Sequence, residues 1–333
     1  MPQPLRIATF NLESLDDRPD VAPPLAARIA VLRPQLLRLK ADVLCLQEVN
    51  GQRPPGGGPR QLLALERLLA ETPYAGFHLI SSSRVSGPDS VADSGAERGA
   101  DAVHNLVILS RHPFGSTEEL RHHLVEPPTY RPKTARPAVG REQAIEWDRP
   151  ILAAAIELAA GRRLHVVNLH LRAPLAAPVP GQKKDAHTWR SVSGWAEGFF
   201  LATVKRAGQA LETRLFIERI FDHDARALVA VCGDFNAEER QTPLRTIRAD
   251  PADTGNATLE GRALVPLERT LPASQRFSVV HGGHKEMLDH VLVSRALLDC
   301  YRHVEVHNEG LADELSDAGP ASHHAPLVAE FAL

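Results

Sequence analysis

Cysteine is scarce in this sequence, with three residues in a chain of 333. Such a small, odd number excludes a disulfide framework of the kind that holds small secreted folds together. Cys45 and Cys232 lie inside apolar, strand-like runs, and Cys300 follows two leucines. We therefore expect buried free thiols in a reducing compartment, and the cytoplasm is the expected location.

Long apolar runs are also missing. No segment stays apolar over the length that a membrane-spanning helix requires. The first residues lack the charged region and apolar region of a secretory signal. We expect no transmembrane segment, and nothing in the sequence indicates an obligate protein partner.

Neither sign of charge dominates, because 38 basic residues and 41 acidic residues leave a net charge of −3. This balance excludes a surface that attracts polyanions as a whole. The charge is uneven, however: residues 121–141 contain five basic side chains against one acidic, and residues 172–219 contain eight against four. Such stretches are either solvated faces or the flanks of a site for an anionic substrate.

The sequence has the composition of a globular protein with a sizeable core, being 43% hydrophobic and 24% charged. Helical spacing of leucines predicts helices at residues 25–39 and 62–69, and a longer one at 195–221; Pro34 should kink or break the first. Residues 81–102, 121–148 and 173–191 have the composition of long loops.

Since no linker divides the chain, we expect one domain over residues 1–333. Apolar runs predict strands at residues 5–11, 42–48, 77–80, 105–110, 151–158, 164–170, 227–233, 277–281, 288–294 and 325–331.

The most informative stretch is VAVCGDFNAE, at residues 229–238. An apolar, β-branched run indicates a buried strand, and Asp234 and Asn236 stand at its end. Positions two apart share a face of a strand, so both oxygen-bearing groups can face one spot. A carboxylate and an amide oxygen suit a hard divalent cation, although Asp and Asn are also common turn residues.

Other strand-like runs end in residues that bind metals or transfer protons. Glu48 closes an otherwise apolar run, and burying a lone carboxylate is costly without a cation or hydrogen bonds. Asp289 would likewise be an uncompensated buried charge unless a cationic partner such as His324 meets it. Asn11 by itself is more typical of a strand-end cap than of a metal ligand. The residues singled out in these runs are Asn11, Gln47, Glu48, Asn168, His170, Asp289, His323 and His324.

Seven motifs in this order resemble the endonuclease/exonuclease/phosphatase superfamily, from about Arg6 to Phe331: TFNLES, LCLQEVN, NLVILSRHPF, VVNLHL, CGDFNAE, LDHVLVS and SHHAPL. The resemblance implies a four-layer αββα sandwich, in which two mixed β-sheets pack face to face with helices outside. His170 resembles the histidine that the deoxyribonuclease and sphingomyelinase branches of the family have at this place. Abasic-site endonucleases lack it.

The resemblance also implies roles for individual residues. Asn11 and Glu48 would be metal ligands, with Mg²⁺ or Mn²⁺ as the cofactor. Asp234 and Asn236 would position the attacking water, or contact the metal and phosphate. Asp289 and His324 would form a dyad, and His170 would assist it. Asn168 would support the phosphate, and Arg111 would either reach a substrate phosphate or be a surface turn arginine.

The sequence departs from the family at Ser322-His323-His324, where relatives have Ser-Asp-His. The missing aspartate is a metal ligand or supports one in relatives. His323 can still ligate, but an imidazole suits Mn²⁺ or Zn²⁺ better than Mg²⁺. A smaller departure is His290, where an aromatic residue is common.

The expected function is hydrolysis of a phosphodiester by in-line attack of an activated water, as in a nuclease. Basic loops at residues 131–141 and 183–190 can flank nucleic acid, and Trp189 and Trp195 either stack on bases or pack their loop against the body. The alternative is a phosphatase or phosphodiesterase acting on a small molecule or lipid headgroup. An inactive binding module of the same fold is a further alternative.

Overall fold

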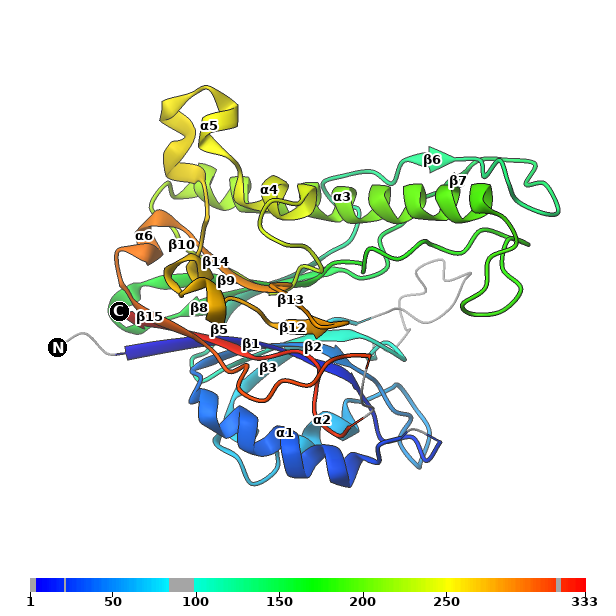
Figure 1. Cartoon of the computed structure of the whole chain (residues 1–333). Coiled ribbons are helices and arrows are strands. Elements are labelled where there is room, and N and C mark those ends of the chain that lie inside the picture. The colour runs from blue at the N-terminus through cyan, green and yellow to red at the C-terminus, as the bar shows by residue number, and fades with distance from the viewer. Residues whose placement is uncertain (1–3, 21, 84–98, 316–318) are drawn as a thin grey trace.

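The computed structural model describes residues 4–20, 22–83, 99–315 and 319–333. Two six-stranded sheets face each other, and helices cover their outer faces (Figure 1). The first sheet has the order β15-β16-β1-β2-β4-β3, and it joins both ends of the chain because β1 pairs with β16. Its strands are β1 (Pro4–Leu15), β2 (Val43–Val49), β3 (His78–Ser81), β4 (Asn105–Ser110), β15 (Tyr301–Val306) and β16 (Leu327–Ala332).

The second sheet has the order β11-β14-β10-β9-β8-β5. Both sheets are mixed, since β1 is parallel to β2 and β10 is parallel to β9, whereas the other pairs within them are antiparallel. The strands of the second sheet are β5 (Phe114–Leu120), β8 (Ile151–Glu157), β9 (Arg163–His170), β10 (Leu228–Asp234), β11 (Val265–Pro266) and β14 (Asp289–Val293). Two further strand pairs are β6 (Thr129–Tyr130) with β7 (Gln143–Ala144) and β12 (Val279–His281) with β13 (His284–Glu286).

Helices lie on both outer faces, which gives the predicted four layers. In Figure 1, α1 (Leu25–Leu39) and α2 (Leu63–Leu69) cover the first sheet, while α3 (Val192–His223) and α4 (Thr242–Arg248) cover the second. Two one-turn helices are α5 (Pro251–Thr254) and α6 (Arg295–Leu298). Short 3-10 turns cover Pro73–Gly76, Ala159–Gly161, Ala257–Arg262, Leu267–Thr270 and Ala273–Gln275. Within the described part of the chain, no helix is both long and apolar enough to cross a membrane.

Alternation of side chains along the strands builds three apolar layers. Inward positions such as Ile7, Val166 and Val291 fill the space between the sheets. Their neighbours face outward, where Phe10 packs with α1 and Val231 packs with α3. Both faces of each sheet are therefore covered, so the central strands are apolar on both sides and are recognisable in the sequence as continuous runs.

The elements differ from the sequence-based expectation in several places, and the short elements β6, β7, β11, β13, α4, α5 and α6 were not predicted. The prediction missed β5 and β15, since these edge strands have the mixed sequences FGSTEEL and YRHVEV and are largely solvent-accessible. Pro34 was expected to kink or break its helix, yet α1 runs unbroken through it. Leu32, Leu36 and Leu39 on its inner face are fully buried, and this packing holds the helix together despite one missing backbone hydrogen bond.

The expected loops and thiols are placed as follows. Residues 121–148 and 173–191 are mostly irregular, apart from β6 and β7. Much of the loop predicted at 81–102 falls on residues 84–98, which lie outside the described residues. Cys45 and Cys232 are buried free thiols, and Cys300 is partly buried.

Candidate active site

The apolar layer between the sheets gives way to polar side chains at one edge. The core between the sheets contains the inward-facing residues Ile7, Cys45, Val166 and Cys232. Further along the same strands, the inward-facing positions are occupied by polar residues. The first polar tier is Thr9, Gln47 and Asn168, and the second contains Asn11, His170, Asp234 and Asp289. All of these residues are buried. The edge therefore holds a dense set of polar groups that must satisfy one another.

Asn168 joins the two sheets and does not face the substrate side. Its Nδ2 donates to the carbonyl oxygens of Leu46 and Val107 at 3.0 and 2.9 Å, across the interface. Its Oδ1 accepts from Gln47 Nε2 at 2.7 Å. Since these contacts use both amide hydrogens of Asn168 and its side chain is fully buried, the predicted contact with a substrate phosphate is not what the structure shows.

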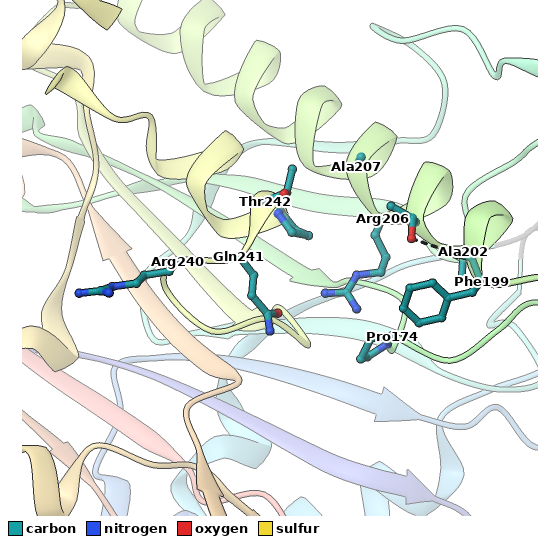
Figure 2. Close-up of a pocket in the computed structure, with 10 residues that line it drawn as sticks. Pro174, Phe199, Ala202, Arg206, Ala207, Arg240, Gln241 and Thr242 are labelled. Atoms are coloured by element: carbon teal, nitrogen blue, oxygen red, sulfur yellow. Dashed lines mark hydrogen bonds between the residues drawn. The ribbon is translucent and has the colours of Figure 1, made fainter. Parts of the chain in front are cut away.

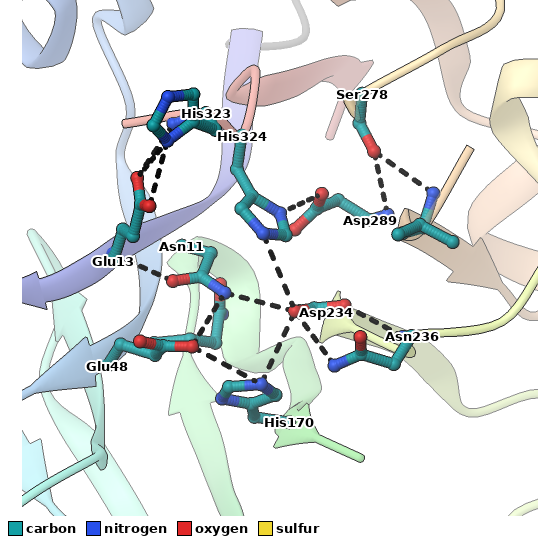
Figure 3. Close-up of polar contacts among 12 residues, drawn as sticks. Asn11, Glu13, Glu48, His170, Asp234, Asn236, Ser278, Asp289, His323 and His324 are labelled. Carbon is teal, nitrogen blue, oxygen red and sulfur yellow. Dashed lines mark hydrogen bonds and ion pairs between the residues drawn. The ribbon is translucent and has the colours of Figure 1, made fainter. Parts of the chain in front are cut away.

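Asp234, the last residue of β10, is the centre of the second tier (Figure 3). Its Oδ2 accepts from Asn11 Nδ2 at 3.0 Å and lies 3.3 Å from His170 Nε2. The same oxygen is 4.0 Å from His324 Nε2. Residues from both sheets thus converge on one carboxylate oxygen.

Asp289 and His324 form the predicted pair. His324 Nδ1 lies 2.7 Å from Asp289 Oδ2, which directs its other nitrogen toward Asp234. Burial opposes a charge on His324, but Asp289 and Asp234 outweigh it and raise the pKa of His324 to about 10. The imidazole is consequently a cation with Nε2–H available as a donor near neutral pH.

Glu48 reaches this edge through an irregular backbone. The register of β2 shifts between Leu46 and Val49, and Glu48 has a φ of 59°. Its Oε2 accepts from the backbone N–H and hydroxyl of Ser14 at 3.0 and 3.1 Å, and its Oε1 lies 3.6 Å from His170 Nε2. A left-handed conformation costs about 1–3 kcal/mol in a residue with a side chain, and here it turns the carboxylate away from the helix side and toward the other sheet.

The carboxylates at this edge have opposite pKa shifts. Burial and the neighbouring Asp289 raise the pKa of Asp234 to about 7. Although burial works in the same direction on Glu48, nearby His104, Arg149 and His324 lower its pKa. Burial and the positive charge of Arg149 lower the pKa of His170 well below its ordinary value, so this imidazole is neutral.

Asn236 is a turn residue and also part of the polar cluster, the two roles that the sequence left open. It lies beyond the end of β10 with a φ of 48°, and its backbone N–H donates to Asp234 Oδ1 at 2.7 Å, as in an Asx turn. Its Nδ2 also donates to Asp234 Oδ2 at 3.1 Å and to the Leu171 carbonyl at 3.0 Å. The turn therefore places the amide against the central carboxylate.

His323 pairs with a residue that sequence reasoning did not consider. Its Nδ1 lies 2.8 Å from Glu13 Oε1, and its backbone N–H donates to Glu13 Oε2 at 2.9 Å. Glu13 has a φ of 49°, and Arg28 Nη1 holds its carbonyl at 2.8 Å. This pair lies beside the Asp289–His324 pair in Figure 3.

The other departure from the family pattern has its own buried partner. His290 Nδ1 contacts Glu268 Oε1, and its Nε2 lies 2.8 Å from the Ala237 carbonyl. Although burial opposes its charge, Glu268 raises the pKa of His290. Because alternation turns His290 away from Asp289 toward the outer layer, it supports the turn after β10 and does not join the site.

Arg111 does not reach this edge. It follows Ser110, which pairs with Val43 at the start of β2, whereas Glu48 lies near the end of that strand. The two ends are separated by about 20 Å of strand. Arg111 Nη1 instead forms an ion pair with Asp42 at 2.7 Å. The suggestion that Arg111 contacts a substrate phosphate is therefore wrong, because β4 runs antiparallel to β2.

Two site residues were missed in the sequence. His104 Nε2 lies 3.6 Å from Glu48 Oε2, and its Nδ1 lies 3.0 Å from Arg149 Nη2. Both stand just before strands, in segments that carry no motif, and His104 is one of 16 histidines. The sequence DRPIL did offer a signal, since it places an arginine two residues before a buried strand. Burial lowers the pKa of Arg149, while Glu48 and Asp234 oppose this shift.

The donor set fits a divalent cation. Glu48, Asp234 and Asp289 bring three carboxylates to one buried edge, and Asp289 Oδ1 has no hydrogen-bond partner in the described part of the chain. Ligand atoms of Asp234, Asp289 and His324 all lie within 4.8 Å of one another. Carboxylate oxygens are the ligands that Mg²⁺ and Mn²⁺ prefer. Asn11 turns its Nδ2 toward Glu48 and Asp234, so its amide must turn over to offer Oδ1.

The chain belongs to the Endonuclease/Exonuclease/phosphatase family, whose model matches residues 8–317. Among curated proteins, none matches the sequence significantly. The family assignment and the two facing sheets agree with the resemblance drawn from the motifs.

Solved structures of this family have the same fold. The human Nocturnin catalytic domain with a bound sulfate anion is 18% identical, with a TM-score of 0.56 over 99% of this chain and 93% of that one. A family protein from Bacteroides thetaiotaomicron is 14% identical, with a TM-score of 0.58 over 99% and 95% of the two chains. Truncated TDP2 from Caenorhabditis elegans is 12% identical, with a TM-score of 0.55 over 99% and 98%.

We predict that Asn168→Ala destabilises the fold. The change removes three buried hydrogen bonds, at about 1 kcal/mol each, so the free energy of unfolding should fall by about 3 kcal/mol. Urea denaturation measures this loss. Asn308→Ala is the matched control, because Asn308 also bonds two carbonyls but is only partly buried. Wild-type stability combined with a raised KM would instead indicate that Asn168 contacts the substrate.

We also predict that divalent cations displace a proton from Asp234. With a pKa of about 7, this carboxyl is about half protonated at neutral pH, and a nearby cation favours its ionised form. Titration calorimetry at pH 7 in two buffers of different ionisation enthalpy should show release of roughly half a proton per Mn²⁺. Release should vanish in Asp234→Asn, and affinity should weaken as the pH falls below 7. Equal heats in both buffers would contradict the raised pKa.

Proposed function

We propose that this protein is a divalent-cation-dependent phosphodiesterase of the nuclease type, which hydrolyses a P–O bond by in-line attack of water. The observation that carries the proposal is the convergence of His170 and the Asp289–His324 pair on the Asp234 carboxylate, with Glu48 on the other side of His170 (Figure 3). Members of the family are phosphoester hydrolases, and the fold places these groups at one edge of the sandwich.

Glu48 would hold the cation, together with Asn11 once its amide has turned over. The ion would act as a Lewis acid that neutralises the charge of the phosphate and its leaving oxygen. His324 is less suited to ligation, because its Nδ1 is bonded to Asp289 and its raised pKa keeps a proton on Nε2. His323 is paired with Glu13, which makes it a supporting residue.

Proton transfer falls to Asp234 and to the Asp289–His324 pair. Asp234, with its pKa of about 7, accepts a proton from the attacking water at neutral pH. As the P–O bond breaks, the leaving oxygen receives a proton from Nε2 of His324, whose cationic form Asp289 stabilises. Neutral His170 and the amide of Asn236 hold Asp234 in place. The cationic Arg149 adds positive charge beside Glu48, where phosphate oxygens would lie.

We predict that His324→Ala lowers kcat by about 10³-fold, since it removes both the proton donor and a charge near the phosphate. Asp289→Asn should cause a smaller loss and move the alkaline limb of the pH–rate profile to lower pH, because the pKa of His324 is raised chiefly by Asp289. Steady-state kinetics between pH 6 and 10 measures both effects. Wild-type turnover by folded His324→Ala would exclude the dyad from the reaction.

The function itself is tested with purified protein in Mg²⁺, Mn²⁺ or EDTA. Supercoiled plasmid, single-stranded DNA, bis-p-nitrophenyl phosphate and p-nitrophenyl phosphate are followed in parallel. We expect cation-dependent cleavage of the diesters and loss of about 10³-fold in Glu48→Ala, which removes the principal ligand. Arg111→Ala is the matched control at the far end of β2 and should retain activity.

Each alternative has its own result in this assay. Hydrolysis of p-nitrophenyl phosphate alone would assign a phosphomonoesterase. Cleavage of the small esters without either nucleic acid would favour a small-molecule or lipid-headgroup substrate. No turnover, together with no calorimetric signal for Mn²⁺, would leave a binding module of the same fold.

A further inference from the structure

A cavity of about 370 Å³ lies next to the catalytic edge, between α3, the start of α4 and the segment after β9 (Figure 2). We call it the α3 pocket and define it by Pro174, Phe199, Thr203, Arg206 and Gln241. Pro174 comes four residues after His170, and Arg206 bonds to the carbonyl of Asn236, whose side chain contacts Asp234, so the pocket adjoins the site.

One face of α3 lines the pocket. Phe199, Thr203 and Arg206 recur at helical spacing, so they project from the same side of the helix. Trp195, one turn earlier, extends this face, and its ring centroid is 5.7 Å from that of Phe199. Phe200 is excluded from it, because its ring packs with Tyr130. The face therefore leads from exposed aromatic rings to a buried cation.

Arg206 is the cation at the inner end. Its residue is only 6% exposed, and Nη2 donates to the Asn236 carbonyl at 2.7 Å. It forms no ion pair with any carboxylate in the parts of the chain that the structure describes. The guanidinium points toward the space between Gln241 and Phe199 in Figure 2. The Asp234 carboxylate acts on Arg206 only from a distance, where it opposes the effect of burial on the pKa of the guanidinium. A buried arginine with no carboxylate in direct contact is suited to an anionic ligand.

The outer end is apolar and aromatic. Phe199 and Trp195 are 42% and 46% exposed, although large aromatic side chains are usually well buried. By contrast, Trp189 packs near Gly198 and holds Lys183 over its ring, which is the packing role that the sequence left open. Exposed rings that neighbour one another form a platform on which flat groups stack.

These two ends favour a nucleotide over a lipid chain. A nucleotide combines a phosphate with a flat base, and Gln241 offers an amide for the base edge. An acyl chain in the same place would bury the Arg206 guanidinium and the Gln241 amide against hydrocarbon, which is unfavourable. Base stacking on Phe199 also requires that the base is unpaired.

We propose that the α3 pocket binds an unpaired nucleotide next to the scissile phosphate, with the neighbouring phosphate at Arg206 and the base against Phe199. This proposal rests on the phosphodiesterase function proposed above. It makes the protein selective for single-stranded segments through a face of α3 that lies outside the catalytic groups.

The test uses the full chain and a fluorescein-labelled single-stranded 12-mer, as DNA and as RNA of the same sequence. Phe199→Ala should weaken binding in EDTA by about tenfold in fluorescence anisotropy, and raise KM for the 12-mer similarly in Mn²⁺. The loss should be much smaller with bis-p-nitrophenyl phosphate, which is too small to span the site and the pocket. Leu211→Ala is the matched control, since Leu211 is an equally exposed residue of α3 outside the pocket.

The role of Arg206 has a separate readout. Arg206→Gln should reduce the slope of log affinity against log salt by about 0.7, the value for one phosphate contact on a single strand. Arg206→Lys should restore most of the slope, which a purely structural role would not require. An unchanged slope in Arg206→Gln would show that no substrate phosphate binds at Arg206.

The outcomes separate this proposal from the proposed function. If the wild type hydrolyses bis-p-nitrophenyl phosphate but not the 12-mers, nuclease activity fails, and anisotropy alone then decides the pocket. Binding that is lost in Phe199→Ala supports the pocket even without cleavage. Equal binding of the 12-mer by Phe199→Ala and wild type overturns the pocket proposal. A lipid site would be indicated instead if sedimentation with phosphatidylcholine vesicles depends on Phe199 and binding of the 12-mer does not.

Discussion

The concentration of negative charge at one buried edge is the constraint on which this structure depends. Glu48, Asp234 and Asp289 come from three strands in two sheets and approach one another where solvent is largely excluded. Ionised carboxylates in such a place repel one another and lose hydration, which is why the pKa of Asp234 rises to about 7. The edge is stable only with positive charge, and His324 and Arg149 supply part of it. The remaining negative charge is what a divalent cation would balance in the function proposed above.

Alignment of the two sheets is what makes this edge a site. Asn11 and Glu48 belong to the first sheet, whereas His170, Asp234 and Asp289 belong to the second. A slip of one sheet over the other by one residue would separate the two halves by about 3 Å. The hydrogen bonds from Asn168 to Gln47 and to two backbone carbonyls fix this alignment, directly below the catalytic tier. An amide suits the task, because it donates and accepts without adding another charge to an already crowded region.

The sequence predicted the groups that follow from strand alternation and missed those that depend on irregular backbone. Asn11, His170, Asp234 and Asp289 continue apolar strands in regular register, so their common edge was predictable. Glu48 was found through its motif, but regular alternation would have turned it outward, and only its left-handed conformation brings it in. His104 and Arg149 precede their strands, where no periodicity indicates direction. Arg111 was included although it lies at the other edge of the sheet. Its position at the end of a strand does not reveal which edge it reaches, because that depends on the direction of β4.

The chemistry and the choice of substrate are separated in this fold. The residues proposed to bind a cation and transfer protons are fixed by hydrogen bonds between buried groups, and a change there perturbs several partners at once. The α3 face has few such constraints: Phe199 and Trp195 are exposed, and their replacement leaves the sheet edge intact. The bond from Arg206 to the Asn236 carbonyl, beside Asp234, connects the two regions. A phosphate held at Arg206 therefore lies at a fixed position relative to the attacking group. This geometry allows the α3 face to select the substrate without a change in the carboxylate edge.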